Sequence, residues 1–501
     1  MAARKRILKR LVMIVVALAA LFFLVRGAVS FTYSCKLKTQ VKRFEALGGS
    51  YSVSVLFPRT CSFEENAANL VTAAGLLYDE PGTVLVRLNT SAFNSRIDRK
   101  EGATLAPISP AFGQSIRDAE RIVNVFDRFA TWRGFDRHFA LRAGQGGEVP
   151  WNDAWMPCLE KWIADNRIPL DLAKRAAEIG AASFDCDWDM GYYARLPHLS
   201  MLAELSRLLS IDAVVKAKNG DVAGAMDSVR LSFRLRRLID NQPFLITRFV
   251  SWDLDDVAFG TLQGVLDTVS PDAKDVEALL EELNDRESRN VLTTVLLSEA
   301  IAGRQAFRES QTDSTFPGPT PQSVWANFEF AGVAPHRVCF ALVWIPSADE
   351  YNYLKDMCAF VEQSMLPFPE ALDAAWYAPP FGARVSLPFT TRFVGYFLEP
   401  PLMRLIAAQA QRDADIRMAR TVLALTLYKS ENGAYPDTLD PLVPEYLPAL
   451  QIDPFDGKPL RFAKRGEGFV VYSVYKDKTD DGGVYKGPNT DTGDLTWERS
   501  E

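Results

Sequence analysis

Histidine is scarce in this sequence, and the common catalytic motifs are missing from it. The 501 residues include only three histidines, His138, His198 and His336. Ser-His-Asp catalysis and histidine-bound zinc therefore have few residues to draw on. The chain also lacks the G-x-S-x-G, P-loop, H-E-x-x-H, C-x-x-C and G-x-G-x-x-G patterns. The motifs select no catalytic residue and no cofactor-binding residue.

Cysteine and positive charge are also limited. Six cysteines are too few for a disulfide scaffold. Cys35 with Cys61, and Cys158 with Cys186, are near enough in sequence to pair in an exported domain, and buried free thiols are the equal alternative. The net charge of −7 argues against binding to nucleic acid. A chain of 501 residues exceeds one hydrophobic core, so we expect two or three domains.

An apolar run near the N-terminus has the composition of a membrane anchor. The residues from Leu11 to Val25 are all apolar, and with snorkelling flanks the run from Ile7 approaches the ~20 residues that cross a bilayer. Five positive charges precede it, namely Arg4, Lys5, Arg6, Lys9 and Arg10. This pattern predicts a cytoplasmic N-terminus and an exported body, attached to the bacterial cytoplasmic (inner) membrane by a single pass. A cleaved signal peptide is the alternative, but Arg26–Phe31 offers no Ala-x-Ala site.

Helical periodicity dominates the residues after the anchor. We expect a short helical stem over Leu37–Leu47, ended by Gly48 and Gly49. Ser62 and Glu65 have the spacing of a capping box and predict a helix over Glu65–Tyr78. Between Ser115 and Arg308 helix follows helix, with apolar faces at Ile116–Phe126 and at Leu196–Leu209.

One turn inside this helical region has a clear local signal. Gly220 predicts the end of one helix, Asp221 the N-cap of the next, and Ala225 a close approach of the pair. The turn is similar to the one inside tetratricopeptide repeats, but no 34-residue period surrounds it. We therefore expect an antiparallel helical hairpin and no repeat array.

Proline divides the last part of the chain from the helical part. Thr312–Gln322 reads as a loop, and helical pattern returns at Ala348–Gln363. Seven prolines between Leu366 and Pro401 predict an irregular connection. One long helix over Leu402–Lys429 follows, and the strand candidates are Pro459–Ala463 and Gly468–Tyr475.

The C-terminal segment resembles the globular half of the major pseudopilins of type II secretion. The resemblance rests on a helix that ends in Tyr428–Pro436, on Asp453-Pro454-Phe455-Asp456-Gly457, and on a strand that enters an Asp/Gly loop. It implies one long helix packed on a small antiparallel sheet, and covers about a sixth of the chain. The whole chain more loosely resembles membrane-anchored bacterial proteins that end in such a module, a resemblance that carries no activity.

Two acidic clusters are candidate ion sites. Calcium takes six to eight oxygen ligands from a chain that can wrap the ion. The pseudopilin resemblance implies that the loop Asp477–Gly483 holds calcium, with candidate ligands Asp477, Asp480, Asp481 and Asp494. The alternative is a solvated turn in which the Asp side chains cap their own backbone. For the second cluster, Asp185–Asp189, we expect a solvated interhelical loop with its aromatic residue packed inward.

These observations predict a mainly α protein with four parts. They are a cytoplasmic N-terminus and anchor (1–26), a mainly helical exported domain (27–365), a proline-rich irregular connection (366–401) and a pseudopilin-like α+β domain (402–501). Our first hypothesis is a non-enzymatic envelope protein that serves binding or assembly, with an envelope protein as its partner. The alternatives are a component of a type II secretion pseudopilus and an envelope hydrolase that uses carboxylates of the helical domain. The pseudopilus alternative is weakened because no prepilin Gly precedes the apolar run and no Glu enters it.

Overall fold

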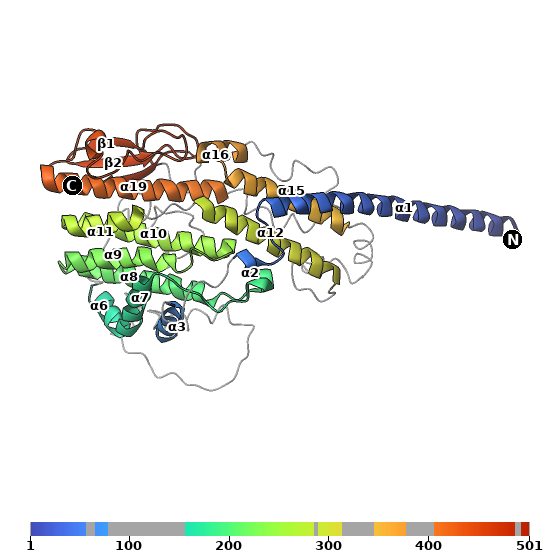
Figure 1. The fold of residues 1–501 in the computed structure, drawn as a ribbon, viewed down its shortest axis with the longest axis horizontal. Coiled ribbons are helices and arrows are strands. Elements are labelled where there is room, and N and C mark those ends of the chain that lie inside the picture. Colours follow the sequence, from blue (N-terminus) through green and yellow to red (C-terminus); the bar gives the residue numbers. More distant parts are fainter. Residues whose placement is uncertain are drawn as a thin grey trace.

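The computed structural model describes residues 2–56, 66–78, 156–284, 289–312, 345–376, 405–485 and 492–499. The described chain is mainly helical, with one small sheet near the C-terminus (Figure 1). Its helices are α1 (Ala2–Ala46), α2 (Val53–Leu56), α3 (Ala68–Leu77), α6 (Met156–Asp165), α7 (Arg167–Ile179), α8 (Pro197–Lys218), α9 (Val222–Arg237), α10 (Leu245–Thr268), α11 (Ala273–Asn284), α12 (Arg289–Thr312), α15 (Pro346–Ser364), α16 (Phe368–Trp376) and α19 (Leu405–Asn432). Short 3-10 helices, η3 (Trp188–Tyr193) and η6 (Asp440–Leu442), join some of them.

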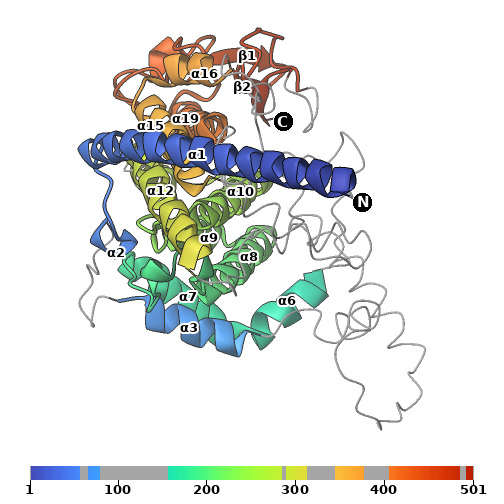
Figure 2. The same ribbon diagram turned by 90° about the vertical axis from the view of Figure 1, so that its right-hand side faces the viewer.

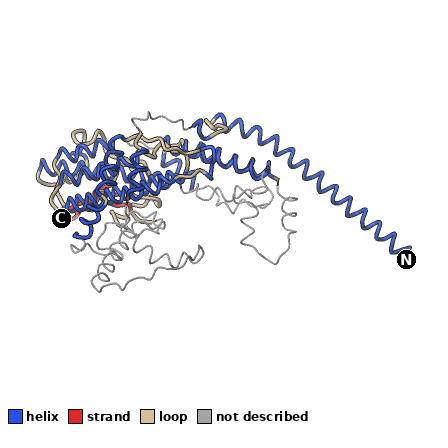
Figure 3. The backbone as a smooth tube through the Cα atoms, turned by 90° about the horizontal axis from the view of Figure 1, so that it is seen from below, coloured by secondary structure: helices blue, strands red, loops and turns tan. Residues whose placement is uncertain are grey.

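The anchor and the stem form one uninterrupted helix, α1. Its apolar part is exposed, as at Leu24, which is 72% exposed, and it is long and apolar enough to cross a membrane. Figure 3 shows this N-terminal part projecting away from the rest of the protein. Gly48, whose φ is +95°, follows the end of the helix, as the sequence predicted. The stem was expected as a separate short helix, but nothing after Arg26 breaks the helical hydrogen bonding.

The second half of α1 packs along α15, and the two helices run parallel. Ser30 Oγ lies 3.5 Å from Ser347 Oγ, and the rings of Tyr33 and Tyr351 meet edge to face at 5.6 Å. Nearly three turns further on, Arg43 donates to both carboxylate oxygens of Glu362. The partners are thus spaced about equally along both helices, which defines a parallel register. Figure 2 shows α1 lying against α15.

The packed face of α1 has the spacing of a helix that is buried on one side. Its half-buried and buried positions recur every three or four residues, at Ser30, Tyr33, Leu37, Gln40 and Phe44. Phe44 is fully buried, whereas Phe31, on the opposite face, is 72% exposed. The stem is thus an integral helix of the folded body.

The predicted helical hairpin is present as α8 and α9. Gly220 adopts a φ of +79°, which a residue without a Cβ reaches at little cost. The side chain of Asp221 accepts a hydrogen bond of 3.0 Å from the backbone N–H of Gly224 and so caps α9. Ala225 is fully buried where the two helices approach each other. All three residue roles that the sequence predicted are confirmed.

The helices lie in layers, with the sheet on one side (Figure 1). From the sheet, the layers pass through α19 to α11 and α10, then to α9 and α8, and finally to α7 and α3. One hydrophobic core runs from Phe44 in α1, through α10, α12 and α15, to α19 and Trp497. A second core joins α3, α7 and the start of α8. Residues 402–501, which the sequence set apart as a domain, share the first core with the helical body.

The C-terminal sheet has three antiparallel strands in the order β1 (Arg461–Arg465), β2 (Gly468–Ser473) and β3 (Leu495–Arg499). Val471 of β2 lies opposite Phe462 on one side and Trp497 on the other. Every residue of β2 is buried because β2 is the central strand. The sequence predicted the first two strands and the long helix α19, but it missed β3.

The structure differs from the sequence-based expectation at the start of the proline-rich connection and at the start of α3. The proline-rich connection begins with the nine-residue helix α16 rather than with irregular chain, because Pro367 and Pro369 stand at its start, where a missing N–H costs little. Before α3, the side chain of Asn66 accepts from the N–H of Ala68, while the N-cap residue itself, Ala67, makes no side-chain hydrogen bond. The predicted Ser62–Glu65 capping box, the face at 116–126 and the loop at 313–322 lie outside the described residues.

Candidate functional site

The structure brings the predicted acidic loop and Asp494 together at the edge of the C-terminal sheet. Oδ2 of Asp494 accepts from the backbone N–H groups of Asp481 (3.1 Å), Gly483 (2.7 Å) and Val484 (3.3 Å). Asp494 is almost fully buried, at 1% exposure. The proximity that the sequence predicted between the loop and Asp494 is therefore confirmed.

Two of the other predicted ligands, Asp477 and Asp480, accept hydrogen bonds from the loop and from residues beside it. Asp477 accepts from the N–H groups of Thr479 and Gly493. Asp480 accepts from the hydroxyl of Tyr472 and from the N–H of Gly482, both at 3.0 Å. Burial of the Tyr472 hydroxyl and its hydrogen bond to Asp480 raise the pKa of Tyr472 to about 12. The carboxylates thus hold the loop in shape in the manner of an Asp-capped turn.

The fit of this loop to a metal ion is partial. Oδ1 of Asp494 is buried and has no hydrogen-bond partner, which leaves one carboxylate oxygen that a cation would satisfy. Burial raises the pKa of Asp494, three N–H donors lower it, and the nearby charge of Asp480 raises it further, with a net increase. Yet within the part of the chain that the structure describes, no three His, Cys, Asp or Glu side chains are placed to hold a metal. Calcium binding at this loop stays a prediction.

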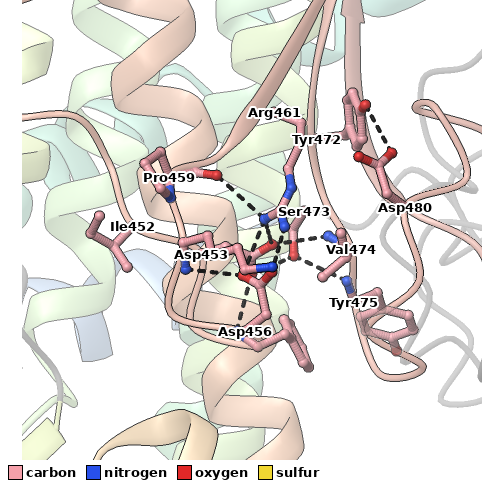
Figure 4. A network of polar contacts seen from close by, with 12 residues as sticks. Ile452, Asp453, Asp456, Pro459, Arg461, Tyr472, Ser473, Val474, Tyr475 and Asp480 are labelled. Atoms are coloured by element: carbon pink, nitrogen blue, oxygen red, sulfur yellow. Dashed lines mark hydrogen bonds and ion pairs between the residues drawn. The ribbon is translucent and has the colours of Figure 1, made fainter.

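A second polar network fixes the turn that precedes the strands (Figure 4). Asp453 is fully buried, and its carboxylate accepts from Ser473 Oγ (2.8 Å) and from the N–H groups of Phe455 and Val474 (both 2.9 Å). Arg461 of β1 donates to the same carboxylate at 3.1 Å and also pairs with Asp456. This network ties the turn at 453–457 to β1 and to the end of β2, and it accounts for the polar residues of that motif.

The acidic cluster at 185–189 acts in packing. Both side-chain oxygens of Asp189 accept hydrogen bonds, from Ser52 Oγ and Ser54 Oγ at 2.7 Å each. Burial pushes the pKa of Asp189 up, but these hydrogen bonds outweigh it, and the pKa is lowered overall. Trp188 packs against Phe244, as an inward aromatic residue was expected to do. The cluster therefore links η3 to the segment around α2.

One group of buried charges in the described residues was missed by the sequence reasoning. We call it the buried arginine cluster: the buried Arg236 of α9, Arg248 of α10 and Arg412 of α19, with the buried Asp255 and the partly buried Asp240 and Asp256. Arg236 Nε lies 3.0 Å from Asp255 Oδ2, and Arg236 Nη1 lies 3.0 Å from Asp240 Oδ2. Arg412 binds both oxygens of Asp256. The cluster joins the consecutive helices α9 and α10 to α19, which follows much later in the chain.

Arg248 is the least satisfied member of the buried arginine cluster. Its Nη2 lies 3.4 Å from Gln409 Oε1 and its Nη1 lies 3.7 Å from Asp240 Oδ1, while Nε has no hydrogen-bond partner. Burial and the nearby charge of Arg236 lower the pKa of Arg248 to about 10, so it stays charged at neutral pH. The available sequence signal was weak, because Arg and Asp at helical spacing usually mark a solvated face.

His198 and two of the cysteines lie in the body as well. His198 is buried at the start of α8, stacked on Phe184 with ring centroids 4.0 Å apart. Its Nδ1 lies 3.8 Å from Cys186 Sγ. Neither Cys35 nor Cys186 forms a disulfide. Of the two alternatives that the sequence left open, the structure therefore has unpaired cysteines at these positions, with Cys186 buried and Cys35 exposed.

Comparisons of the chain with protein-family models, with curated proteins and with solved structures find no match. The pseudopilin resemblance therefore rests on the residues at 428–436, 453–457 and 477–483 alone. The arrangement of one long helix and a small antiparallel sheet agrees with it only in outline.

Proposed function

We propose that the protein is a single-pass envelope protein whose body lies on the exported side of the bacterial cytoplasmic membrane and serves binding or assembly. One observation carries this proposal. The helix α1 exposes its apolar side chains up to Val25 and then enters the body from Ser30 onward. A helix that is apolar and exposed at one end and packed at the other is what a rigid membrane anchor requires.

The orientation follows from the charges that flank the apolar run. Arg4, Lys5, Arg6, Lys9 and Arg10 precede it and keep the N-terminus in the cytoplasm. Removal of the anchor by cleavage near Ser30 would cut the chain beside its contact with Ser347. The packing of the stem therefore supports an anchor that is retained.

A role in binding or assembly is supported by what the buried acids do. A carboxylate hydrolase needs two acids that face a substrate. Asp212, Asp255, Asp256 and Asp453 each bond to Lys or Arg in the interior. These four acids therefore hold the fold together, and the envelope protein that the body would bind remains the expected partner.

Thiol labelling in intact cells tests the topology. Cys35 is exposed on α1, ten residues beyond Val25, so a membrane-impermeant maleimide added to spheroplasts is expected to label it. The variant Cys35→Ser gives the background from the other cysteines. A second variant, Ala3→Cys in the Cys35→Ser chain, is expected to be labelled above that background only after permeabilisation. Labelling of Ala3→Cys but not of Cys35 in unopened spheroplasts would overturn the orientation, and recovery of the body in the soluble fraction would overturn the retained anchor.

We also propose that the loop Asp477–Gly483, together with Asp494, takes up a calcium ion. The support is the partnerless buried Oδ1 of Asp494 and the closeness of Asp480, whose charge a cation would offset. Asp477, Asp480, Asp481 and Asp494 are the residues that would hold the ion. Its role there would be to stabilise the loop against the sheet.

A further inference from the structure

Three side chains from different segments form a buried hydrogen-bonded line. Cys186 lies in the segment between α7 and η3, His198 lies in the first turn of α8, and Gln242 lies between α9 and α10. Cys186 Sγ is 3.8 Å from His198 Nδ1, and His198 Nε2 is 2.9 Å from Gln242 Oε1. The imidazole is thus held between a thiol and an amide.

The amide determines which ring nitrogen carries the proton. Because Oε1 of Gln242 can only accept, Nε2 of His198 is the protonated nitrogen and donates to it. Nδ1 then has a free lone pair, and the S–H group of Cys186 donates to this nitrogen. The Phe184 ring lies almost parallel to the imidazole, with an interplanar angle of 14°, and fixes its plane. This is the arrangement of a nucleophile, an adjacent base and a group that orients the base.

The other described free thiols lack such a base. Cys35 is exposed on α1. Cys358 is buried in α15 near Gln40, an amide that cannot take up a proton, and burial raises the pKa of Cys358. Of the three cysteines that the described residues show without a disulfide, Cys186 therefore differs in having an imidazole beside its sulfur. In a measurement of thiol reactivity, Cys35 is therefore the control for an exposed cysteine and Cys358 the control for a buried one.

We propose that Cys186 is a modification site, a thiol activated by His198 that exchanges with small cationic disulfides. The preference for a cationic reagent follows from Asp185 and Asp187, which are exposed on either side of Cys186. Because Cys186 itself is only 8% exposed, the reagent has to be small. In the cell this reaction rests on the exported location proposed above, where disulfides persist.

The exchange balances without a further reactant. As the proton moves from Sγ to Nδ1 of His198, Sγ attacks one sulfur of the disulfide. A bond forms between Sγ and that sulfur, and the original S–S bond breaks. The departing thiolate takes the proton from Nδ1 and leaves as a thiol. Cys186 is oxidised to a mixed disulfide, and the other half of the reagent is reduced.

The test uses the full-length protein in detergent, with cystamine as the cationic disulfide and oxidised glutathione as the anionic one. Peptide mapping by mass spectrometry follows the rate at Cys186, Cys35 and Cys358 separately. We expect cystamine to react faster with Cys186 than with Cys358. At Cys186, we expect cystamine to react faster than oxidised glutathione. The variant His198→Asn keeps a polar group beside Sγ but supplies no base, and we expect it to slow Cys186 roughly tenfold without changing Cys35.

The pH profile separates activation from a packing role. Burial lowers the pKa of His198, and the hydrogen bond to Gln242 only partly offsets this, so the base is available at and below neutral pH. The rate at Cys186 is expected to level off before pH 7, in contrast to that of free cysteine measured as a reference, whose thiol pKa is about 8.5. If Cys186 reacts only after denaturation, or if His198→Asn leaves its rate unchanged, the proposal is wrong. If His198→Asn loses the native near-UV spectrum, the variant Gln242→Ala takes its place. It removes the acceptor that holds the proton on Nε2 of His198, so an unchanged rate at Cys186 in this variant would likewise show that the proposal is wrong.

Because these rates are measured in detergent, they do not depend on the orientation in the membrane. Failure of the thiol chemistry and failure of the proposed topology are therefore distinguishable.

Discussion

Arg412 of α19 donates from both of its terminal nitrogens to the carboxylate of Asp256 on α10, 156 residues earlier in the chain. The arginine side chain is 4% exposed and the aspartate side chain 19%. This pair connects the C-terminal helix to the helical body. It lies within the buried arginine cluster, where the loss of one partner leaves an uncompensated buried charge.

Replacement of Arg412 by Leu is expected to lower the free energy of unfolding by about 3–5 kcal/mol, because Asp256 would lose its countercharge. Denaturant unfolding followed by circular dichroism measures the effect. The matched control is Lys161→Met, which breaks the exposed Lys161–Asp165 pair and should cost less than about 1 kcal/mol. Equal effects of the two substitutions would show that the buried pair contributes no more than a surface pair.

The stem is expected to stabilise the body through Phe44. Phe44→Ala removes a fully buried ring from the first core and should cost about 3–5 kcal/mol of unfolding free energy. Phe31→Ala, on the exposed face of the same helix, should change the stability by no more than about 0.5 kcal/mol. Both are measured on the full-length protein in detergent. A stable Phe44→Ala variant would contradict an integral role for the stem.

Asp212 is expected to contribute to the loss of stability in acid. It lies 2.8 Å from Lys174 Nζ and 3.0 Å from Lys216 Nζ, and accepts from Ser228 Oγ at 2.6 Å. Burial raises the pKa of Asp212, but its hydrogen bonds and the two lysines outweigh burial and lower it overall. The stabilisation is therefore present above the unfolded-state pKa of about 3.9 and is lost as pH falls through the lower folded-state value.

The variant Asp212→Asn tests this linkage. At pH 7 it should be less stable than the wild type by about 1–3 kcal/mol, and the difference should shrink below pH 4. Asp437→Asn is the control, because Asp437 pairs with Lys464 at the surface and is largely exposed. A difference between wild type and Asp212→Asn that stays constant from pH 7 to pH 2 would rule out the ionic contribution.

Calcium is expected to raise the melting temperature of the protein if the loop Asp477–Gly483 and Asp494 bind it. At ~100-fold excess over Kd, the linkage amounts to about 2.7 kcal/mol. The melt compares millimolar calcium with chelator, and Asp494→Ala and Asp481→Ala should abolish the difference. It uses the full chain, because the first core continues from the sheet into the helical body. Identical melting with calcium and chelator would leave the loop as an Asp-capped turn.

The parts of the fold that the sequence predicted have local causes. Gly220 and Asp221 act on the backbone within a few residues of themselves, so their roles could be derived without knowledge of the fold. The long helix α19 and the strand β2 could also be predicted without knowledge of the fold, because the apolar residues of each recur with the period of that element. The acidic loop was found because Asp and Gly cluster in sequence. Its closeness to Asp494 followed from the pseudopilin resemblance.

The parts that were missed depend on distant segments. β3 has five residues, and its pairing is set by β2, which lies more than twenty residues earlier. The buried arginine cluster assembles Arg236, Arg248 and Arg412 from three helices, and each of these charges alone reads as part of a solvated surface. The partnership of Cys186 with His198 depends on a chain that turns back through η3. No local pattern contains this information.

The parallel register of α1 and α15 also determines how far the body can move. A flexible linker of 20 residues would let a tethered domain wander over roughly 25 Å. Here the same residues form a helix of about 30 Å that is packed along the body and has no hinge after Arg26. Ser30 and Ser347 meet four residues beyond Arg26, about 6 Å along the helix axis. The body would therefore stand at one height above the bilayer, and a partner would have to come to that height to meet it.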